Sequence, residues 1–180
     1  MRTRTEPSGS ARLTAETDSD LLALLERIAG TGPLDVQAVR LMVEPYAAQS
    51  AASNATAADL EAIRNTHLAV SDAVEMELFE RLDAEFHRQI FAATRNDLLS
   101  CVHDVLKIIR GQSAWIDIKR RSFSETRRRE YAAQHGLIVN ALFERNASAA
   151  AESMRAHLRT VSHNLFGDEG ETIQLSKRSS

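Results

Sequence analysis

Residues 74–94 read VEMELFERLDAEFHRQIFAAT, and this stretch decides the fold. It contains neither glycine nor proline, the two residues that most often end a helix. Its bulky apolar side chains recur at the spacing of one helical face, at Phe79, Phe86 and Ile90. The stretch therefore predicts an amphipathic helix with one face turned toward a protein core.

The same pattern continues through most of the chain. Between Leu34 and Phe166 the only glycines are Gly111 and Gly136, and the three prolines all lie in the first quarter of the sequence. Such a sequence favours helices, and no Asn-Gly or Asp-Gly turn separates alternating apolar runs. We predict an all-α fold, an antiparallel bundle of six or seven helices.

Capping residues and breakers set the expected boundaries. Pro45 is expected to bend its helix or to start it afresh. The polar ends of the chain give a flexible arm over 1–17 and a disordered tail over 168–180, on either side of a helical domain over 18–167. The expected helices span residues 18–30, 35–52, 56–71, 74–94, 98–118, 122–145 and 148–167.

Composition and charge narrow the function. The 180 residues include 22 Lys and Arg against 25 Asp and Glu, a net charge of −3 that disfavours a free-standing nucleic-acid binder. The single cysteine, Cys101, excludes an internal disulfide and any CxxC motif. No apolar run approaches the roughly 20 residues of a membrane span, and no signal peptide is recognisable. A cytoplasmic protein is expected.

Three histidines and one aspartate fall on apolar helical faces: Asp83 and His87 one turn apart, His135, and His157. Each alone would be read as a hydrogen-bonded core residue. Burying a polar group without a partner costs about 1–3 kcal/mol, so four of them favour one shared partner. A divalent cation satisfies all four, and this ligand set suits zinc, nickel, iron or manganese.

The remaining histidines allow a different hypothesis. His67 and His163 are expected at the surface. His103 and Asp104 form a His-Asp doublet like that of metal phosphohydrolases of the HD type, but only this dipeptide supports a hydrolase. A third hypothesis is an interaction bundle that binds no metal.

Five segments, in this order and spacing, resemble one family. They are RLMVEPYAA at 40–48, LDAEFH at 82–87, NDLL at 96–99, the segment 131–141, and MRAHL at 154–158. The chain resembles the FCD effector-binding domain of GntR-family bacterial transcription regulators of the FadR-like branch.

The resemblance implies that Asp83, His87, His135 and His157 bind a divalent metal, most simply zinc, with nickel and manganese as alternatives. The metal would help to hold a small organic acid. Four protein ligands leave an octahedral ion two positions, enough for a carboxylate and a neighbouring hydroxyl or keto oxygen. An anionic effector is also favoured by the positive charge of the metal.

Candidate residues for the effector pocket follow. Arg40 is expected to clamp the far end of the acid, because a guanidinium pairs with a carboxylate through two hydrogen bonds; the alternative is a solvent-facing arginine. Trp115 and Tyr131 are expected to form pocket walls, although core packing explains both equally well. A basic run is expected to be a solvated corner between helices: Lys119, Arg120, Arg121, Arg127, Arg128 and Arg129.

By this resemblance the chain is a sensing domain and not an enzyme. Its expected partners are a small carboxylate effector and a second copy of itself, with no membrane. GntR-family regulators bind DNA through a winged helix-turn-helix domain that precedes the sensor. Residues 1–16 are too short to form that domain, so the chain as given is expected to sense without reading DNA itself. The acid itself is not fixed by the sequence.

Overall fold

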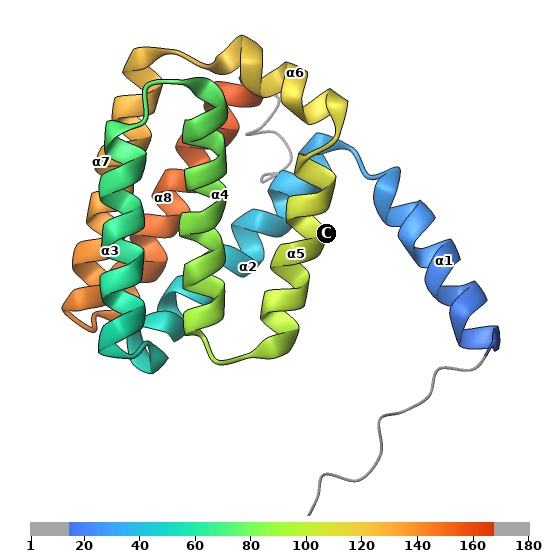
Figure 1. The fold of residues 1–180 in the computed structure, drawn as a ribbon, viewed down its shortest axis with the longest axis horizontal. Coiled ribbons are helices and arrows are strands. Elements are labelled where there is room, and N and C mark those ends of the chain that lie inside the picture. The colour runs from blue at the N-terminus through green and yellow to red at the C-terminus, as the bar shows by residue number, and fades with distance from the viewer. Residues whose placement is uncertain (1–14, 168–180) are drawn as a thin grey trace, which may run out of the picture. The chain divides into compact units, whose positions relative to one another are not determined.

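A computed structural model of the chain describes residues 15–167. These residues form eight α-helices and no β-strand, so the prediction of an all-α fold is confirmed (Figure 1). The helices are α1 (Ala15–Ala29), α2 (Pro33–Asn54), α3 (Ala57–Asp72), α4 (Met76–Ala93), α5 (Asp97–Arg110), α6 (Ser113–Ser122), α7 (Glu125–Phe143) and α8 (Ala147–Phe166).

Helix α1 belongs to a unit of its own, residues 1–31, and the other helices form a second unit within residues 32–180. Most of the expected arm and the whole expected tail, residues 168–180, lie outside the described residues, and residues 15–17 begin α1. That residues 18–31 share one domain with the bundle stays a prediction.

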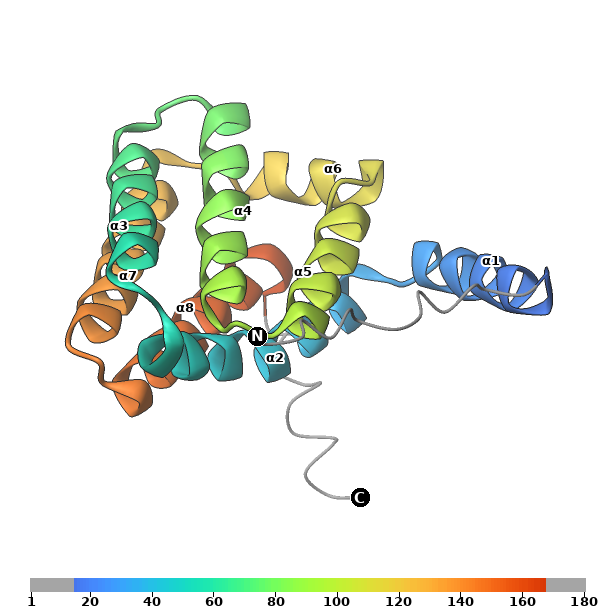
Figure 2. The same ribbon diagram turned by 60° about the horizontal axis from the view of Figure 1, so that its bottom comes forward.

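The second unit is an antiparallel bundle. Helix α2 packs along α8, and α8 packs against α7. Helix α3 contacts both α4 and α7, as Figures 1 and 2 show from two sides. Helix α6 is short and connects the end of α5 to the start of α7 (Figure 1). Three helices, α4, α7 and α8, thus have faces that meet inside the bundle.

Local capping explains where these helices begin. Thr56 and Asp59 form a capping box at α3, in which the Asp59 N–H donates to Thr56 Oγ1 over 3.2 Å. The side chain of Ser124 caps α7 in the same way. At α8 the cap is Asn146, two residues before the expected start at Ser148. Asparagine and serine are preferred there because their side-chain oxygens accept unpaired N–H groups of the first turn.

The expected helix over residues 98–118 is two helices. It is interrupted at Gly111 and Gln112, between α5 and α6, where glycine loses more conformational entropy than other residues would. This break accounts for one helix more than the upper expected number. Pro45, in contrast, lies inside an uninterrupted α2, although it has no N–H to donate.

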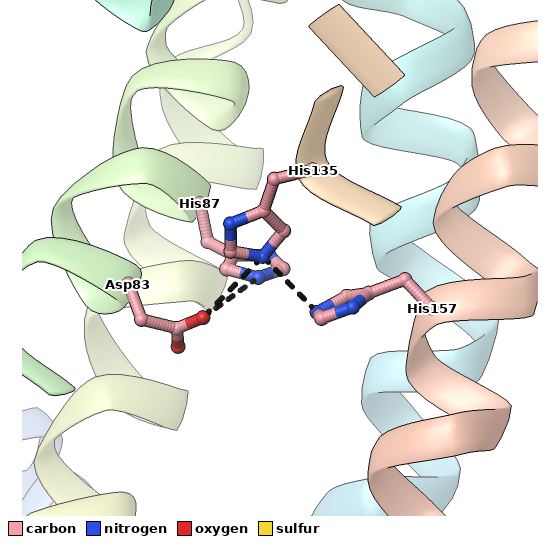
Figure 3. Close-up of side chains that lie close together, drawn as sticks. All are labelled: Asp83, His87, His135 and His157. Carbon is pink, nitrogen blue, oxygen red and sulfur yellow. Dashed lines mark hydrogen bonds and ion pairs between the residues drawn. The ribbon is translucent and has the colours of Figure 1, made fainter. Parts of the chain in front are cut away.

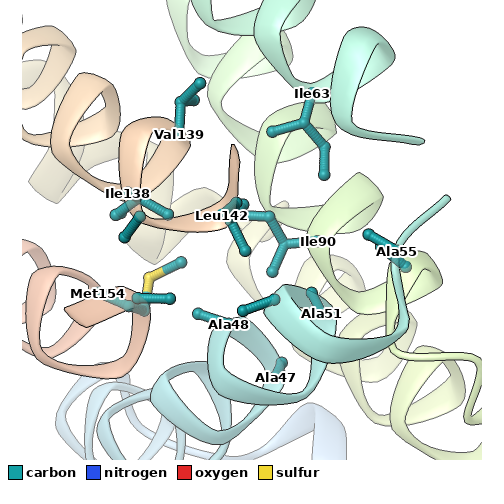
Figure 4. Close-up of a cluster of buried hydrophobic side chains, with 14 of the residues drawn as sticks. Ala47, Ala48, Ala51, Ala55, Ile63, Ile90, Ile138, Val139, Leu142 and Met154 are labelled. Atoms are coloured by element: carbon teal, nitrogen blue, oxygen red, sulfur yellow. The ribbon is translucent and has the colours of Figure 1, made fainter. Parts of the chain in front are cut away.

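An apolar core fills the centre of the bundle (Figure 4). Helix α2 contributes mostly alanines to it, which let the helix axes approach closely. Larger side chains from the surrounding helices fill the remaining space, among them Ile63, Ile90, Ile138, Leu142 and Met154.

Next to this core α2 also buries three polar side chains, Gln37, Arg40 and Glu44, each no more than 2% exposed. Their partners lie in the site described below. Among residues 15–167, no helix combines the length and the apolar character that crossing a membrane requires.

Candidate metal centre

The structure brings together the four residues selected from the helical faces (Figure 3). Asp83 and His87 come from α4, His135 from α7 and His157 from α8. All four are buried, and none is more than 7% exposed. Each offers one nitrogen or oxygen atom such that these atoms lie within 4.8 Å of one another.

The separations fit ligands of a single ion. Asp83 Oδ1 lies 3.4 Å from His135 Nε2 and 3.8 Å from His87 Nε2, and the Nε2 atoms of His135 and His157 are 3.3 Å apart. Two neighbouring ligand atoms bound about 2.1 Å from one metal ion are about 3.4 Å apart in a tetrahedral site and about 3.0 Å apart in an octahedral one. The donor set, three imidazoles and a carboxylate, suits zinc and its first-row neighbours.

A hydrogen-bond network orients His157. Thr160 donates its hydroxyl proton to the Ala156 carbonyl, so its oxygen accepts from the Gln134 amide nitrogen over 2.9 Å. The Gln134 amide oxygen is then left to accept from His157 Nδ1 over 3.0 Å. With the proton of His157 on Nδ1, its Nε2 presents a lone pair toward His135.

His87 is oriented by a carboxylate. Glu44 Oε2 lies 2.6 Å from His87 Nδ1, and Glu44 Oε1 accepts from Arg40 Nε over 2.6 Å. A carboxylate beside Nδ1 favours the tautomer of His87 with its proton on that nitrogen, which leaves Nε2 available to an ion. Carboxylates and amides in contact with the outer nitrogen of metal-binding histidines are common, because they fix the ring and raise its basicity.

The site therefore gathers several lone pairs close to one point. His157 Nδ1 lies at hydrogen-bond distance from Gln134, His87 Nδ1 faces the Glu44 carboxylate, and the Nε2 atoms of both turn inward with that of His135 and the Asp83 carboxylate. A proton on His135 Nε2 can be shared with only one or two of the facing atoms, whereas a divalent cation can bind all four groups at once. The four residues thus fit a divalent metal ion as their common partner.

The protonation states favour the same partner. Burial lowers the pKa of His135 to about 3 and lowers the pKa of His157 well below its ordinary value. Burial alone would raise the pKa of Asp83, but the adjacent histidines and Arg110 hold it below its usual range. At neutral pH the imidazoles of His135 and His157 are thus neutral and the Asp83 carboxylate is ionised, the forms that bind metal.

Acid is expected to destabilise the metal-free protein as the pH falls from 6.5 toward about 3. An unfolded chain protonates His135 near its ordinary pKa of 6.5, whereas the folded chain does so near 3. The stability is therefore fully present above pH 6.5 and lost below it. Urea unfolding with chelator present, from neutral pH to about pH 4, measures this loss. A His135→Phe variant should lose less over that range, and equal slopes for both proteins would contradict the assignment.

Glu44 and Gln134, which contact His87 and His157 from outside the four-residue group, should affect the affinity for metal without binding the metal themselves. Glu44→Gln and Gln134→Leu are each expected to weaken zinc binding by about 10–100-fold. Competition with a chromophoric chelator measures the affinity. Glu152→Gln, which changes an exposed carboxylate on α8, is the control and should leave the affinity unchanged. If Glu44→Gln and Gln134→Leu both bind zinc as tightly as the parent, the contacts of Glu44 and Gln134 do not orient the histidines.

A cavity opens beside the four residues. Asp83 and His157 form part of its wall. It extends along α8 from His157 past Val161 to Leu165, about 12 Å of helix axis. Its lining comes from α2, α4, α5, α6, α7, α8 and the turn after α6: Arg40, Phe79, Glu80, Asp83, Arg110, Lys119, Ser122, Phe123, Arg127, Arg128, Tyr131, His157, Val161 and Leu165.

The three residues proposed for the effector pocket lie in different places. Arg40 lines the cavity but is buried and already paired with Glu44 and Gln37. Tyr131 lines the cavity, and burial raises the pKa of its hydroxyl to about 12. Trp115 is buried against Phe166, with ring centroids 6.0 Å apart, and is not part of the cavity lining.

The structure corrects the interpretation of the basic run. Lys119, Arg127 and Arg128 line the cavity, whereas Arg120 and Arg129 are exposed and pair with neighbouring carboxylates. The predicted solvated corner is therefore right for the exposed residues of the run and wrong for those that line the cavity. Helical periodicity did not separate the two groups, because the run spans the turn between α6 and α7.

Four further polar residues were missed by the sequence analysis. Arg110 lies 3.6 Å from Asp83, and burial together with repulsion from Arg40 lowers its pKa. Glu44 and Gln134 are the outer partners of the histidines, and Glu80 pairs with Lys119. Glu44 lies in the segment 40–48 that resembles the family. A carboxylate on a helix that faces the histidines was the signal that could have identified it. Gln134 gave none, because its role depends on a contact between two helices.

The other histidines do not join the site. His163 is exposed as expected, but His67 is partly buried and its ring lies against Gly136. His103 is buried against Phe91, and burial lowers its pKa to about 4. Asp104 beside it is 65% exposed, so this doublet does not assemble a buried metal site.

Comparison with known proteins identifies the family of the chain. Residues 35–160 match the FCD domain. The chain is 29% identical over 180 residues to the Glc operon transcriptional activator of Escherichia coli strain K12, covering 90% of this chain and 71% of the activator. The same protein of Escherichia coli O6:H1 gives the same values. These relatives are transcription regulators by name and not enzymes.

Two solved structures share the fold. Streptococcus agalactiae GntR superposes with a TM-score of 0.58 and 24% identity, over 76% of this chain and 58% of that protein. The chain thus spans less than two thirds of the Streptococcus agalactiae protein. Escherichia coli McbR/YncC gives a TM-score of 0.70 and 17% identity, over 85% of this chain and 80% of that chain.

The match to the FCD domain covers more than two thirds of the sequence, and the sequence motifs, the helical fold and the related regulators agree with it. The chain belongs to the FCD domain family of GntR-type transcription regulators.

Proposed function

We propose that this domain senses a small organic acid at a divalent metal ion and thereby controls DNA binding by a linked winged helix-turn-helix. The single observation that carries the proposal is the buried group Asp83, His87, His135 and His157, whose metal-binding atoms converge at the wall of a cavity. Zinc is the first candidate, with nickel and manganese as alternatives.

The surrounding residues support a ligand-binding role. Glu44 orients His87, and Gln134 orients His157, so that both rings present Nε2 to the same point. When bound, the metal would supply a positive charge and open coordination positions for a carboxylate and an adjacent hydroxyl or keto oxygen. Arg40 and Tyr131 offer donors in the same cavity, and Trp115 would act on the pocket only through packing.

Regulation would follow from coupling between binding and helix positions. The metal ligands come from α4, α7 and α8, so an acid in this cavity contacts three helices of the bundle at once. A ligand shifts a conformational equilibrium by its difference in affinity for the two states. In a homodimer, such a shift would change the spacing of the linked DNA-binding domains. The similarity to a Glc operon transcriptional activator supports this regulatory role.

The proposal is tested by titrating zinc-loaded and chelated protein with hydroxy and keto acids such as lactate and pyruvate. Calorimetry should detect binding in the zinc-loaded protein only, accompanied by a rise in melting temperature. Equal binding with and without metal would contradict a metal-dependent sensor. Hydrolysis of a phosphate monoester that His103→Ala abolishes would instead favour the hydrolase hypothesis.

A further inference from the structure

The cavity beside the metal centre has an excess of positive charge. Five cationic side chains line it, Arg40, Arg110, Lys119, Arg127 and Arg128, against two carboxylates, Glu80 and Asp83. Glu44, paired with Arg40 behind the wall, removes one more positive charge. These groups leave an excess of two positive charges; outside the wall, the half-exposed Glu125 contacts both Arg128 and Arg129.

A bound divalent metal would add two further positive charges to this excess. A single carboxylate would neutralise one of these charges. Buried charges of one sign are costly in a medium of low dielectric constant, so the cavity favours a ligand with more than one negative charge.

The cations lie at two positions along the cavity. Arg40 and Arg110 belong to the metal end, where Arg110 is 3.6 Å from Asp83. Lys119 lies on α6, and Arg128 is seven residues before His135 on α7, about 10 Å along the helix axis. Along α7, the backbone of Arg127 and Arg128 thus lies about two helical turns from the proposed ligand His135.

Donors remain available at both positions. The Nε groups of Arg110 and Arg128 are buried and have no hydrogen-bond partner among the described residues. Arg127 uses Nη1 to donate to Ser122, over 2.9 Å to its carbonyl and 2.8 Å to its hydroxyl oxygen. Lys119 Nζ lies 2.5 Å from Glu80, and Arg128 also donates to the Ser71 carbonyl. Guanidinium groups of this kind bind carboxylates and phosphates through paired hydrogen bonds.

We infer that the effector has two anionic groups. One, a carboxylate with a neighbouring hydroxyl or keto oxygen, binds at the metal end. The second, a carboxylate or a phosphate, binds to Lys119, Arg127 and Arg128 at the turn between α6 and α7. This inference rests on the proposed function and specifies the class of acid: a hydroxy or keto dicarboxylate, or a phosphorylated acid.

Matched probes test the second anionic group. Malate has a carboxylate where lactate has a hydrogen, and the amide of its far carboxyl group has nearly the same shape with one charge fewer. Zinc-loaded protein should bind malate at least about tenfold more tightly than this amide. 3-Phosphoglycerate compared with glycerate tests a phosphate in the same position.

Single substitutions test which residues cause the preference for malate over the amide. Lys119→Gln and Arg127→Gln should each reduce the preference for malate over the amide to within about threefold. Two variants are offered because either could disturb the turn, and circular dichroism verifies the fold. Arg120→Gln and Arg129→Gln, from the exposed members of the same run, should keep the full preference.

The outcomes separate this inference from the proposed function. If lactate and the amide bind in a metal-dependent way but malate binds no better, the proposed function stands and the second anionic group is wrong. A loss of preference in Arg120→Gln equal to that in Arg127→Gln would also overturn the inference, since it would indicate only a general surface potential. If none of the acids binds zinc-loaded protein, the proposed function fails and the inference fails with it.

Discussion

Zinc-loaded protein is expected to melt about 10 °C above chelated protein, and His135→Ala and His157→Ala should abolish this difference. A ligand present at about a thousand times its dissociation constant stabilises the folded state by about 4 kcal/mol. For a chain of this length each kcal/mol corresponds to about 2–4 °C. Differential scanning calorimetry with and without chelator measures the effect.

The control is His163→Ala, which removes an exposed histidine from the same helix as His157. It should retain the full response to zinc. A difference of the parent's size in His157→Ala would contradict the assigned ligand. Modest and equal losses in all variants, with no response to chelator in the parent, would favour the metal-free interaction bundle.

Arg40→Met is expected to destabilise the protein by about 3–5 kcal/mol, because it leaves the buried Glu44 carboxylate without its main partner. Arg40 is 1% exposed, and its Nε lies 2.6 Å from Glu44 Oε1. Burial alone would raise the pKa of Glu44, but Arg40 and His87 hold it well below its ordinary value. The loss is measured by urea unfolding at neutral pH.

An exposed pair provides the comparison for this prediction. Arg64 and Glu61 form an ion pair on α3 in which both side chains are about half-exposed. Arg64→Met should cost less than about 1 kcal/mol. Adding Glu44→Gln to Arg40→Met should recover part of the lost stability. A cost for Arg40→Met no larger than that for Arg64→Met would show that the buried pair contributes little.

Helical periodicity predicted much of the candidate site. It identified Asp83, His87, His135 and His157 because each interrupts an apolar face, and this pattern depends only on the helix that contains the residue. The structure places all four together at the junction of α4, α7 and α8. That they bind metal stays a prediction.

Contacts between helices could not be predicted in the same way. Glu44 and Gln134 act through side chains of other helices, and no spacing within α2 or α7 identifies their partners. Lys119 and Arg127 face the cavity only because the chain turns between α6 and α7. A break between the helices 98–118 and 122–145 was expected, but not the separate short helix α6 that begins after the unanticipated break at Gly111.

Metal content is the most direct test of a metal centre at Asp83, His87, His135 and His157. Protein purified without chelator and without a metal-affinity column is analysed by elemental mass spectrometry. We expect about one zinc, nickel or manganese ion per chain, and a clear deficit in His157→Ala. A parent chain that contains no metal, even after incubation with several divalent ions, would contradict the metal centre and leave the three histidines as core residues.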